Sequence, residues 1–120
     1  MKRIYYNKLI RDKIPEKIKR NGGDYEIKKL SKKLFEAELL KKVGEEASGL
    51  MSSKTRDELA SELADIIAVI EEIKKLKRIT SKQILKTLKE NFAKKGGFNK
   101  KLFLVWSSDT GYKTNERRNK

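Results

Sequence analysis

Apolar side chains recur at steps of three and four residues over two long stretches of the chain, and this spacing predicts two amphipathic helices. The first helix is expected from Leu30 to Leu50 and the second from Thr55 to Ile73. The apolar positions of the first are Leu30, Leu34, Ala37, Leu40, Val43, Ala47 and Leu50. Those of the second are Leu59, Leu63, Ile66, Ile70 and Ile73, with Ile67 and Val69 beside them. We expect the two helices to pair as an antiparallel hairpin, because the connection between them is short.

Polar residues and glycines mark the ends of the predicted helices. Thr55 and Glu58 match a capping box, in which the threonine hydroxyl accepts from the Glu58 amide and the Glu58 side chain reaches back. Residues 52–54 come just before it and are expected to break the first helix. A second capping box at residues 80–83 opens a third helix, which the two glycines at 96–97 should end. The buried side of this third helix is expected to carry Ile84, Leu88 and Phe92.

The segments outside these helices are shorter and less regular. Pro15 fits the first turn of a short helix, with Asp12 upstream as its cap. Residues 4–6 and residues 101–106 are rich in β-prone side chains, and each can form a short strand. The expected fold class is therefore mainly α, with two long antiparallel helices, short flanking helices and a short strand near either end.

The length of the chain, 120 residues, favours one domain with one core. We expect this domain to span residues 1–108. Residues 109–120 are polar and have little to bury, so they are expected to form a C-terminal tail.

The charge of the chain is strongly positive, with 31 Lys and Arg against 17 Asp and Glu, a formal net charge of +14. Such a charge attracts polyanions, including nucleotides, nucleic acid and acidic membrane surfaces. The absence of Cys and His excludes disulfides, thiolate or imidazole metal sites and cysteine or histidine catalysis. No apolar run approaches the ~20 residues that cross a bilayer, and no signal region follows the basic N-terminus. We expect a soluble cytoplasmic protein.

Two acidic clusters stand out in this basic sequence. Glu45 and Glu46 lie on the first long helix, and Glu62 and Asp65 lie at i, i+3 on the second, so that each pair lies beside the apolar stripe. Carboxylates on facing helices repel one another unless a cation or a proton lies between them, and Mg²⁺ prefers oxygen ligands. The same pattern is also explained by acids that offset nearby lysines on a solvated face. On the residues alone, the two interpretations are about equally supported.

Basic residues near both ends are candidates for binding phosphate. They are Arg11 and Lys13 in the N-terminal part and Lys94 and Lys95 further along the chain. Gly96 and Gly97 follow the two lysines, and their backbone amides can approach an anion closely. The glycine pair is equally well explained as a simple helix stop. The other lysine pairs are expected on solvated helix faces: Lys28-Lys29, Lys32-Lys33, Lys41-Lys42 and Lys74-Lys75. Three aromatic residues are assigned to core packing rather than to base stacking: Tyr5, Tyr6 and Trp106.

Several of these motifs occur together, in order, in one known family. The run YNKLIRDKIPE at residues 6–16 resembles the opening of small MazG-like proteins described as phosphoribosyl-ATP pyrophosphohydrolase-like. The resemblance continues through residues 45–46, 58–59 and 62–66, and it ends with Lys-Gly-Gly-Phe at residues 95–98. This family belongs to the all-α nucleoside triphosphate pyrophosphohydrolase superfamily.

The resemblance implies a MazG-like helical domain that cleaves a nucleoside triphosphate, or a related phosphoribosyl nucleotide, to the monophosphate and pyrophosphate. The acids of the superfamily bind Mg²⁺, with Mn²⁺ as an alternative, to position the triphosphate and activate water. Carried over by position, the metal ligands are Glu46, Glu62 and Asp65, and Glu45 with Glu46 would act in catalysis. The family also implies a homo-oligomer, either a dimer or a tetramer.

The sequence departs from the superfamily pattern at Gly49, where a third acid of the first helix is expected. Either Glu45 replaces this acid, or the site has decayed. The alternative function is therefore a catalytically impaired nucleotide- or nucleic-acid-binding module of the same fold. The charge of +14 permits a nucleic-acid partner, but a nucleotide substrate is favoured.

Overall fold

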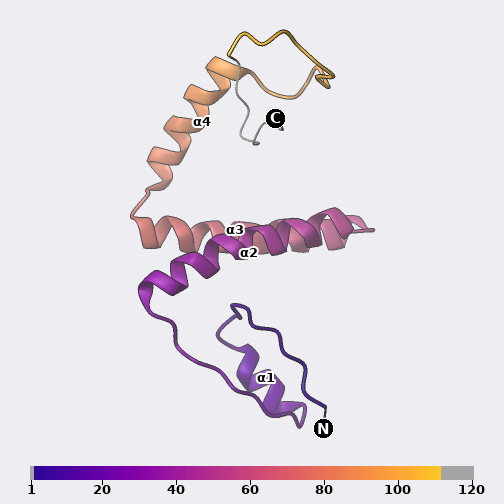
Figure 1. Cartoon of the computed structure of the whole chain (residues 1–120), viewed down its shortest axis with the longest axis vertical. Coiled ribbons are helices and arrows are strands. Elements are labelled where there is room, and N and C mark those ends of the chain that lie inside the picture. The colour runs from indigo at the N-terminus through magenta and orange to yellow at the C-terminus, as the bar shows by residue number, and fades with distance from the viewer. Residues whose placement is uncertain (1, 112–120) are drawn as a thin grey trace. The chain divides into compact units, whose positions relative to one another are not determined.

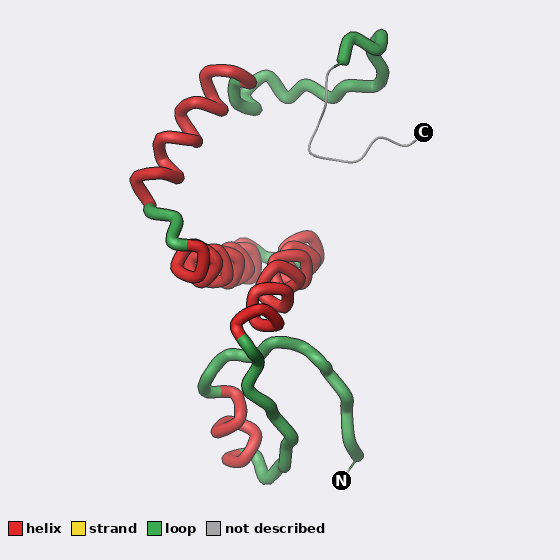
Figure 2. Tube along the Cα trace, turned by 60° about the vertical axis from the view of Figure 1, so that its left-hand side comes forward, coloured by secondary structure: helices red, strands yellow, loops and turns green. Residues whose placement is uncertain are grey.

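The computed structural model describes residues 2–111, and these residues form four α-helices joined by loops (Figure 1, Figure 2). The helices are α1 (Ile14–Arg20), α2 (Lys32–Ser52), α3 (Arg56–Lys77) and α4 (Ser81–Lys95). The prediction of a mainly helical chain is confirmed in this range. No helix in the described range is both long and apolar enough to span a membrane.

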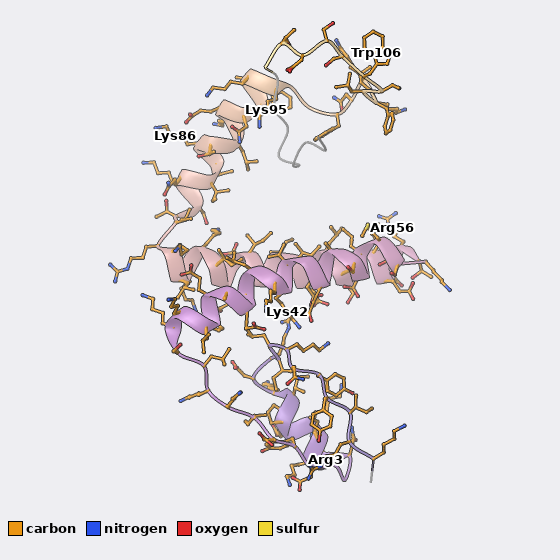
Figure 3. The ribbon with its side chains drawn as sticks, viewed as in Figure 1. Arg3, Lys42, Arg56, Lys86, Lys95 and Trp106 are labelled. Atoms are coloured by element: carbon orange, nitrogen blue, oxygen red, sulfur yellow. The ribbon has the colours of Figure 1, made fainter. Side chains whose placement is uncertain are left out.

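The two short strands predicted from composition are wrong. Residues 4–6 and residues 101–106 are loops, and residues 2–111 contain no strand. A strand requires a neighbour that pairs with its backbone, so β-prone side chains alone do not form one. The prediction that the aromatic residues of these loops pack in a core is also wrong. Trp106 is 78% exposed (Figure 3), and Tyr5 and Tyr6 are exposed as well.

Local capping fixes the ends of the two long helices. The Ser31 hydroxyl accepts a hydrogen bond from the Leu34 amide and begins α2 two residues later than the apolar spacing suggested. At the start of α3 both halves of the predicted capping box are present, with Thr55 accepting from the Glu58 amide at 3.1 Å and Glu58 accepting from the Thr55 amide at 3.0 Å. The predicted break is confirmed, since α2 ends at Ser52.

The short N-terminal helix α1 forms around Pro15, as predicted, but the prediction of its cap is wrong. Lys13 takes the N-cap position, and no side chain caps the helix there. Asp12 lies one residue too early in the chain to cap it. The proline itself needs no amide partner in the first turn, which makes a side-chain cap less necessary.

Helices α2 and α3 pair in antiparallel orientation across a connection of three residues, and among the described residues they are the helices that contact each other. Near the start of α2, Glu36 lies 3.2 Å from the ammonium group of Lys77 at the end of α3. Near the end of α2, Gly49 lies against Glu62 in the second turn of α3. The predicted helical hairpin therefore forms, and it brings the acidic segments of the two helices opposite each other (Figure 1).

Two apolar residues of the described chain are buried, namely Leu39 of α2, which is 4% exposed, and Val69 of α3, which is 8% exposed. Leu40, which the spacing placed on the buried stripe, is 56% exposed instead. Apolar residues lie on more than one side of α2, so their spacing shows that a helix forms but does not determine which side meets α3. In the structure, Leu39 rather than Leu40 lies on the buried side of α2.

The chain divides into two compact units, Met1–Ile84 and Leu85–Lys120. The second unit contains most of α4, whose start is capped by Thr80 accepting from the Gln83 amide and whose end is followed by Gly96 at a positive φ of 77°. The glycine stop is thus confirmed. The prediction of a buried side on this helix is wrong, since its three expected residues are exposed: Ile84, Leu88 and Phe92. The single domain at 1–108 stays a prediction, and of the tail only residues 109–111 lie in the described range.

Candidate metal site

Three carboxylates from the two paired helices lie close together. Glu46 comes from α2, and Glu62 and Asp65 come from successive turns of α3. One oxygen of each carboxylate lies within 4.8 Å of the chosen oxygens of the other two, and all three residues are half-buried. The i, i+3 spacing puts Glu62 and Asp65 on one side of α3, and the antiparallel pairing brings Glu46 opposite them. The structure therefore brings together the three acids that the resemblance names as metal ligands.

This arrangement fits a small divalent cation. Around octahedral Mg²⁺, with metal–oxygen bonds of about 2.1 Å, neighbouring oxygens are about 3.0 Å apart and opposite oxygens are about 4.2 Å apart. The three carboxylate oxygens, which lie within 4.8 Å of one another, would therefore have to move closer together around the ion. Mg²⁺ usually retains several waters and binds to few protein groups, so three oxygens from half-buried side chains suffice. The chemistry of the donors, all carboxylate oxygens, suits Mg²⁺ and Mn²⁺ better than softer metals.

Within the cluster, the ionised form of the Glu62 carboxyl is disfavoured. Desolvation against the neighbouring helix raises the pKa of Glu62 above its ordinary value, and repulsion from Glu46 and Asp65 raises it further. Each of these causes disfavours the charged form of the carboxyl. A cation between the three groups would remove the repulsion and favour the ionised form.

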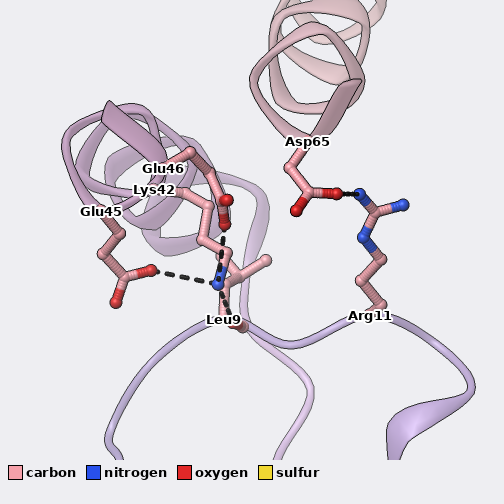
Figure 4. A network of polar contacts seen from close by, with 6 residues as sticks. All are labelled: Leu9, Arg11, Lys42, Glu45, Glu46 and Asp65. Atoms are coloured by element: carbon pink, nitrogen blue, oxygen red, sulfur yellow. Dashed lines mark hydrogen bonds and ion pairs between the residues drawn. The ribbon is translucent and has the colours of Figure 1, made fainter. Parts of the chain in front are cut away.

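Lys42 of α2 takes part in the site, although the sequence placed it on a solvated face. Its ammonium group lies 3.0 Å from Glu45 and 3.8 Å from Glu46, and it donates a hydrogen bond to the backbone oxygen of Leu9 at 3.0 Å (Figure 4). The Lys42 side chain is only 18% exposed. The expectation of a solvated lysine is wrong because the N-terminal segment passes beneath this side of α2 and covers it. The spacing of Lys42 from the two glutamates, three and four positions, was the one signal in the sequence.

Arg11, which the sequence proposed for phosphate binding, lies at the edge of the cluster. Its guanidinium donates to Oδ1 of Asp65 at 2.8 Å, and both side chains are partly exposed (Figure 4). Exposed ion pairs of this kind contribute between zero and about 1 kcal/mol to stability. The pair therefore orients Asp65 more than it stabilises the fold.

The other candidate residues lie away from the three clustered oxygens. Glu45 points toward Lys42 and is not among the three acids whose oxygens gather. Lys13 is the exposed N-cap residue of α1. Lys95, Gly96 and Gly97 belong to the second unit, where Lys95 ends α4 and the glycines follow it.

Gly49, the position where the superfamily pattern has a third acid, contacts the cluster directly. A methyl group built on its Cα would lie 2.6 Å from Oε2 of Glu62. The Glu62 carboxylate therefore fills the space beside Gly49.

No protein-family model matches the chain, and no curated protein or solved structure matches it either. The MazG-like resemblance thus rests on the motifs quoted from the sequence.

Proposed function

We propose that this protein is a Mg²⁺-dependent nucleotide pyrophosphohydrolase of the MazG-like type. It would cleave a nucleoside triphosphate, or a related phosphoribosyl nucleotide, to the monophosphate and pyrophosphate. The observation that carries the proposal is the meeting of Glu46, Glu62 and Asp65, whose oxygens lie within 4.8 Å of one another across two helices. The ordered motifs of the MazG-like resemblance support the same activity.

In this proposal Glu46, Glu62 and Asp65 hold the divalent cation. The bound ion would neutralise phosphate charge and lower the pKa of a water molecule. Glu45 lies one residue from the cluster on the same helix and is the acid that would accept a proton from the attacking water. Lys42 holds Glu45 by an ion pair of 3.0 Å and so fixes its direction.

The substrate phosphates would meet basic groups beside the acids. Arg11 is within reach of a phosphate bound near Asp65, and its planar guanidinium can bind two phosphate oxygens at once. Lys13 belongs to the same segment. Lys95, Gly96 and Gly97 stay phosphate-binding predictions that rest on the sequence.

The test is hydrolysis of common and damaged nucleoside triphosphates in millimolar Mg²⁺, with the phosphorus product identified by ³¹P NMR. We expect pyrophosphate and the monophosphate, and we expect a chelator to stop the reaction. Release of orthophosphate would indicate a different bond cleavage. Absence of turnover with every nucleotide would contradict the proposal.

A binding module without catalysis is the second candidate, favoured by Gly49 in place of a third acid and by the charge of +14. Binding to nucleic acid would involve many phosphates, so affinity would fall by about 10³-fold or more between 50 and 200 mM salt. A single nucleotide makes few such contacts. A shallow salt dependence together with turnover would therefore favour the enzyme over the module.

A further inference from the structure

Gly49 and Glu62 approach each other too closely for a side chain at position 49 unless the Glu62 carboxylate moves. A Cβ built on Gly49 would lie 2.6 Å from Oε2, 2.9 Å from Cδ and 3.2 Å from Oε1 of Glu62. Real Cβ atoms essentially never come within 3.0 Å of such neighbours. The end of the Glu62 side chain thus occupies the volume that a side chain on Gly49 would need.

A second glycine on the same helix, Gly44, provides a comparison. A Cβ built on Gly44 would have nothing within 4 Å. Neither glycine has a positive φ, so the backbone of α2 does not require glycine at either position. Glycine in a helix interior costs about 1 kcal/mol relative to alanine. Both glycines carry this cost in helix stability, but only at position 49 does the missing side chain leave room for a close neighbour, Glu62.

We infer that Gly49 is a positioning residue, whose missing side chain lets the Glu62 carboxylate lie against α2 beside Glu46 and within reach of Asp65. The inference rests on the proposed function, because it concerns the geometry of the same cation site. It also changes the meaning of the missing third acid. Glu62 of the facing helix uses the space that a side chain at 49 would fill.

A methyl group at position 49 would displace the carboxylate rather than the helix. The atoms in the way are Cδ and both oxygens of Glu62, which form the far end of a flexible side chain, and no backbone atom is among them. Alanine also favours the helix more than glycine does. Gly49→Ala should therefore preserve α2 while it moves the Glu62 carboxylate away from its two partners.

The experiment compares Mn²⁺ binding, measured by electron paramagnetic resonance and calorimetry, in the wild-type chain, Gly49→Ala and Gly44→Ala. We expect Gly44→Ala to bind like the wild type and Gly49→Ala to bind about 10–100-fold more weakly, the usual cost of changing a residue that orients a metal ligand. Both variants should melt at or above the wild-type temperature. A merely structural role for Gly49 would lower the melting temperature and leave the affinity of the folded protein unchanged.

A double-mutant cycle shows whether Gly49 acts through Glu62. In a Glu62→Gln background the displaced ligand is already lost, so adding Gly49→Ala should weaken Mn²⁺ binding by less than about twofold. A further large loss in this background would mean that Gly49 acts by another route and would overturn the inference.

The outcomes separate the inference from the proposed function. If the wild type binds no Mn²⁺, the proposed function is wrong and the inference falls with it. If the wild type and Gly49→Ala bind equally well, the inference is wrong and the proposed function stands. Independently of any variant, the wild type should show a nuclear Overhauser effect between the Gly49 α-protons and the Glu62 γ-protons. Its absence would overturn the inference even if Gly49→Ala failed to fold.

Discussion

Each acid of the cluster has a different neighbour. Asp65 accepts a hydrogen bond from Arg11, Glu46 lies 3.8 Å from Lys42, and Glu62 lies against Gly49. Two of the three carboxylates thus have a cationic partner, whereas the pKa of Glu62 is raised by desolvation and by its acidic neighbours. A divalent cation would relieve the repulsion most directly at Glu62.

The first prediction concerns Asp65. Asp65→Asn should abolish Mg²⁺-dependent hydrolysis, because an amide carries no charge for the cation and the other two acids do not replace it. The fold should survive, since the lost ion pair with Arg11 is partly exposed and worth at most about 1 kcal/mol. Turnover and melting temperature, each with and without Mg²⁺, measure both effects. Asp57→Asn in the exposed first turn of α3 is the matched control, and equal activity in both variants would contradict the site.

The sequence predicted the acids better than their surroundings. Glu62 and Asp65 are one helical turn apart, so their meeting follows from local geometry alone. The roles of Lys42 and Gly49 depend on contacts with the N-terminal segment and with α3, which no local spacing encodes. The acidic cluster could therefore be expected from sequence spacing, whereas the contact of Gly49 with the Glu62 carboxylate could not.

At the scale of the helix, the second prediction concerns the start of α3. Thr55→Ala should destabilise the chain by about 1 kcal/mol, because it leaves the Glu58 amide without its acceptor. Ser61→Ala, an exposed position inside the same helix, is the matched control and should be neutral or slightly stabilising. Thermal or denaturant unfolding measures both. Equal stability of the two variants would show that this cap contributes nothing.

The third prediction concerns the other half of the cap. Hydrogen bonds from the backbone amides of Lys54 and Thr55 lower the pKa of Glu58 below its ordinary value of 4.5. The ionised carboxylate therefore adds stability above that pH, and the stability is lost as the pH falls through the lowered pKa. Melting temperatures of the wild type and Glu58→Gln should differ at neutral pH and converge in acid. A constant difference at every pH would contradict this assignment.

The fourth prediction concerns the contact between α2 and α3. Leu39→Ala should cost about 2–5 kcal/mol, because the truncated side chain leaves a cavity beside α3. The neighbouring Leu40→Ala, at a position 56% exposed, should cost far less in the isolated chain. Unfolding at low protein concentration compares them. A loss from Leu39→Ala no larger than that from Leu40→Ala would contradict the observed side of the helix.

The elements that could be predicted from sequence are those specified by neighbouring residues. The start of α3 follows from Thr55 and the end of α2 from the residues at 52–54, which act within one turn of the chain. The cap at Ser31 is equally local, but the apolar spacing placed the start of α2 at Leu30 instead. The strands required a pairing partner elsewhere in the fold, and residues 2–111 contain no strand that provides one. The β-propensity of residues 4–6 and 101–106 therefore predicted their structure wrongly.

For the molecule as a whole, the burial of only Leu39 and Val69 among the described residues suggests that the isolated chain is incompletely packed. A chain of this length usually buries well over half of the surface that its unfolded state exposes. Large apolar residues of the paired helices remain exposed, namely Leu34, Leu40, Met51, Leu59, Leu63, Ile67 and Ile70. We expect a second copy to cover part of this surface.

The fifth prediction is thus a homo-oligomer, either a dimer or a tetramer, at micromolar concentration. Sedimentation should give a mass of two or four times 14.0 kDa. Dilution should lower the melting temperature, because the association stabilises the folded chain by mass action. A single species of 14.0 kDa, with a melting temperature independent of concentration, would contradict the prediction.

The polar contacts of the N-terminal segment have a consequence for the order in which the contacts of the fold can form during synthesis. Arg11 and Asp65 are 54 positions apart in the sequence. At a synthesis rate of about 5–20 residues per second, Asp65 is added roughly 3–11 s after Arg11. The helical hairpin needs only a three-residue connection and can close as soon as α3 leaves the ribosome. The contact of Arg11 with Asp65 can therefore form only after α3 has been made, whereas the contact of Leu9 with Lys42 needs only α2.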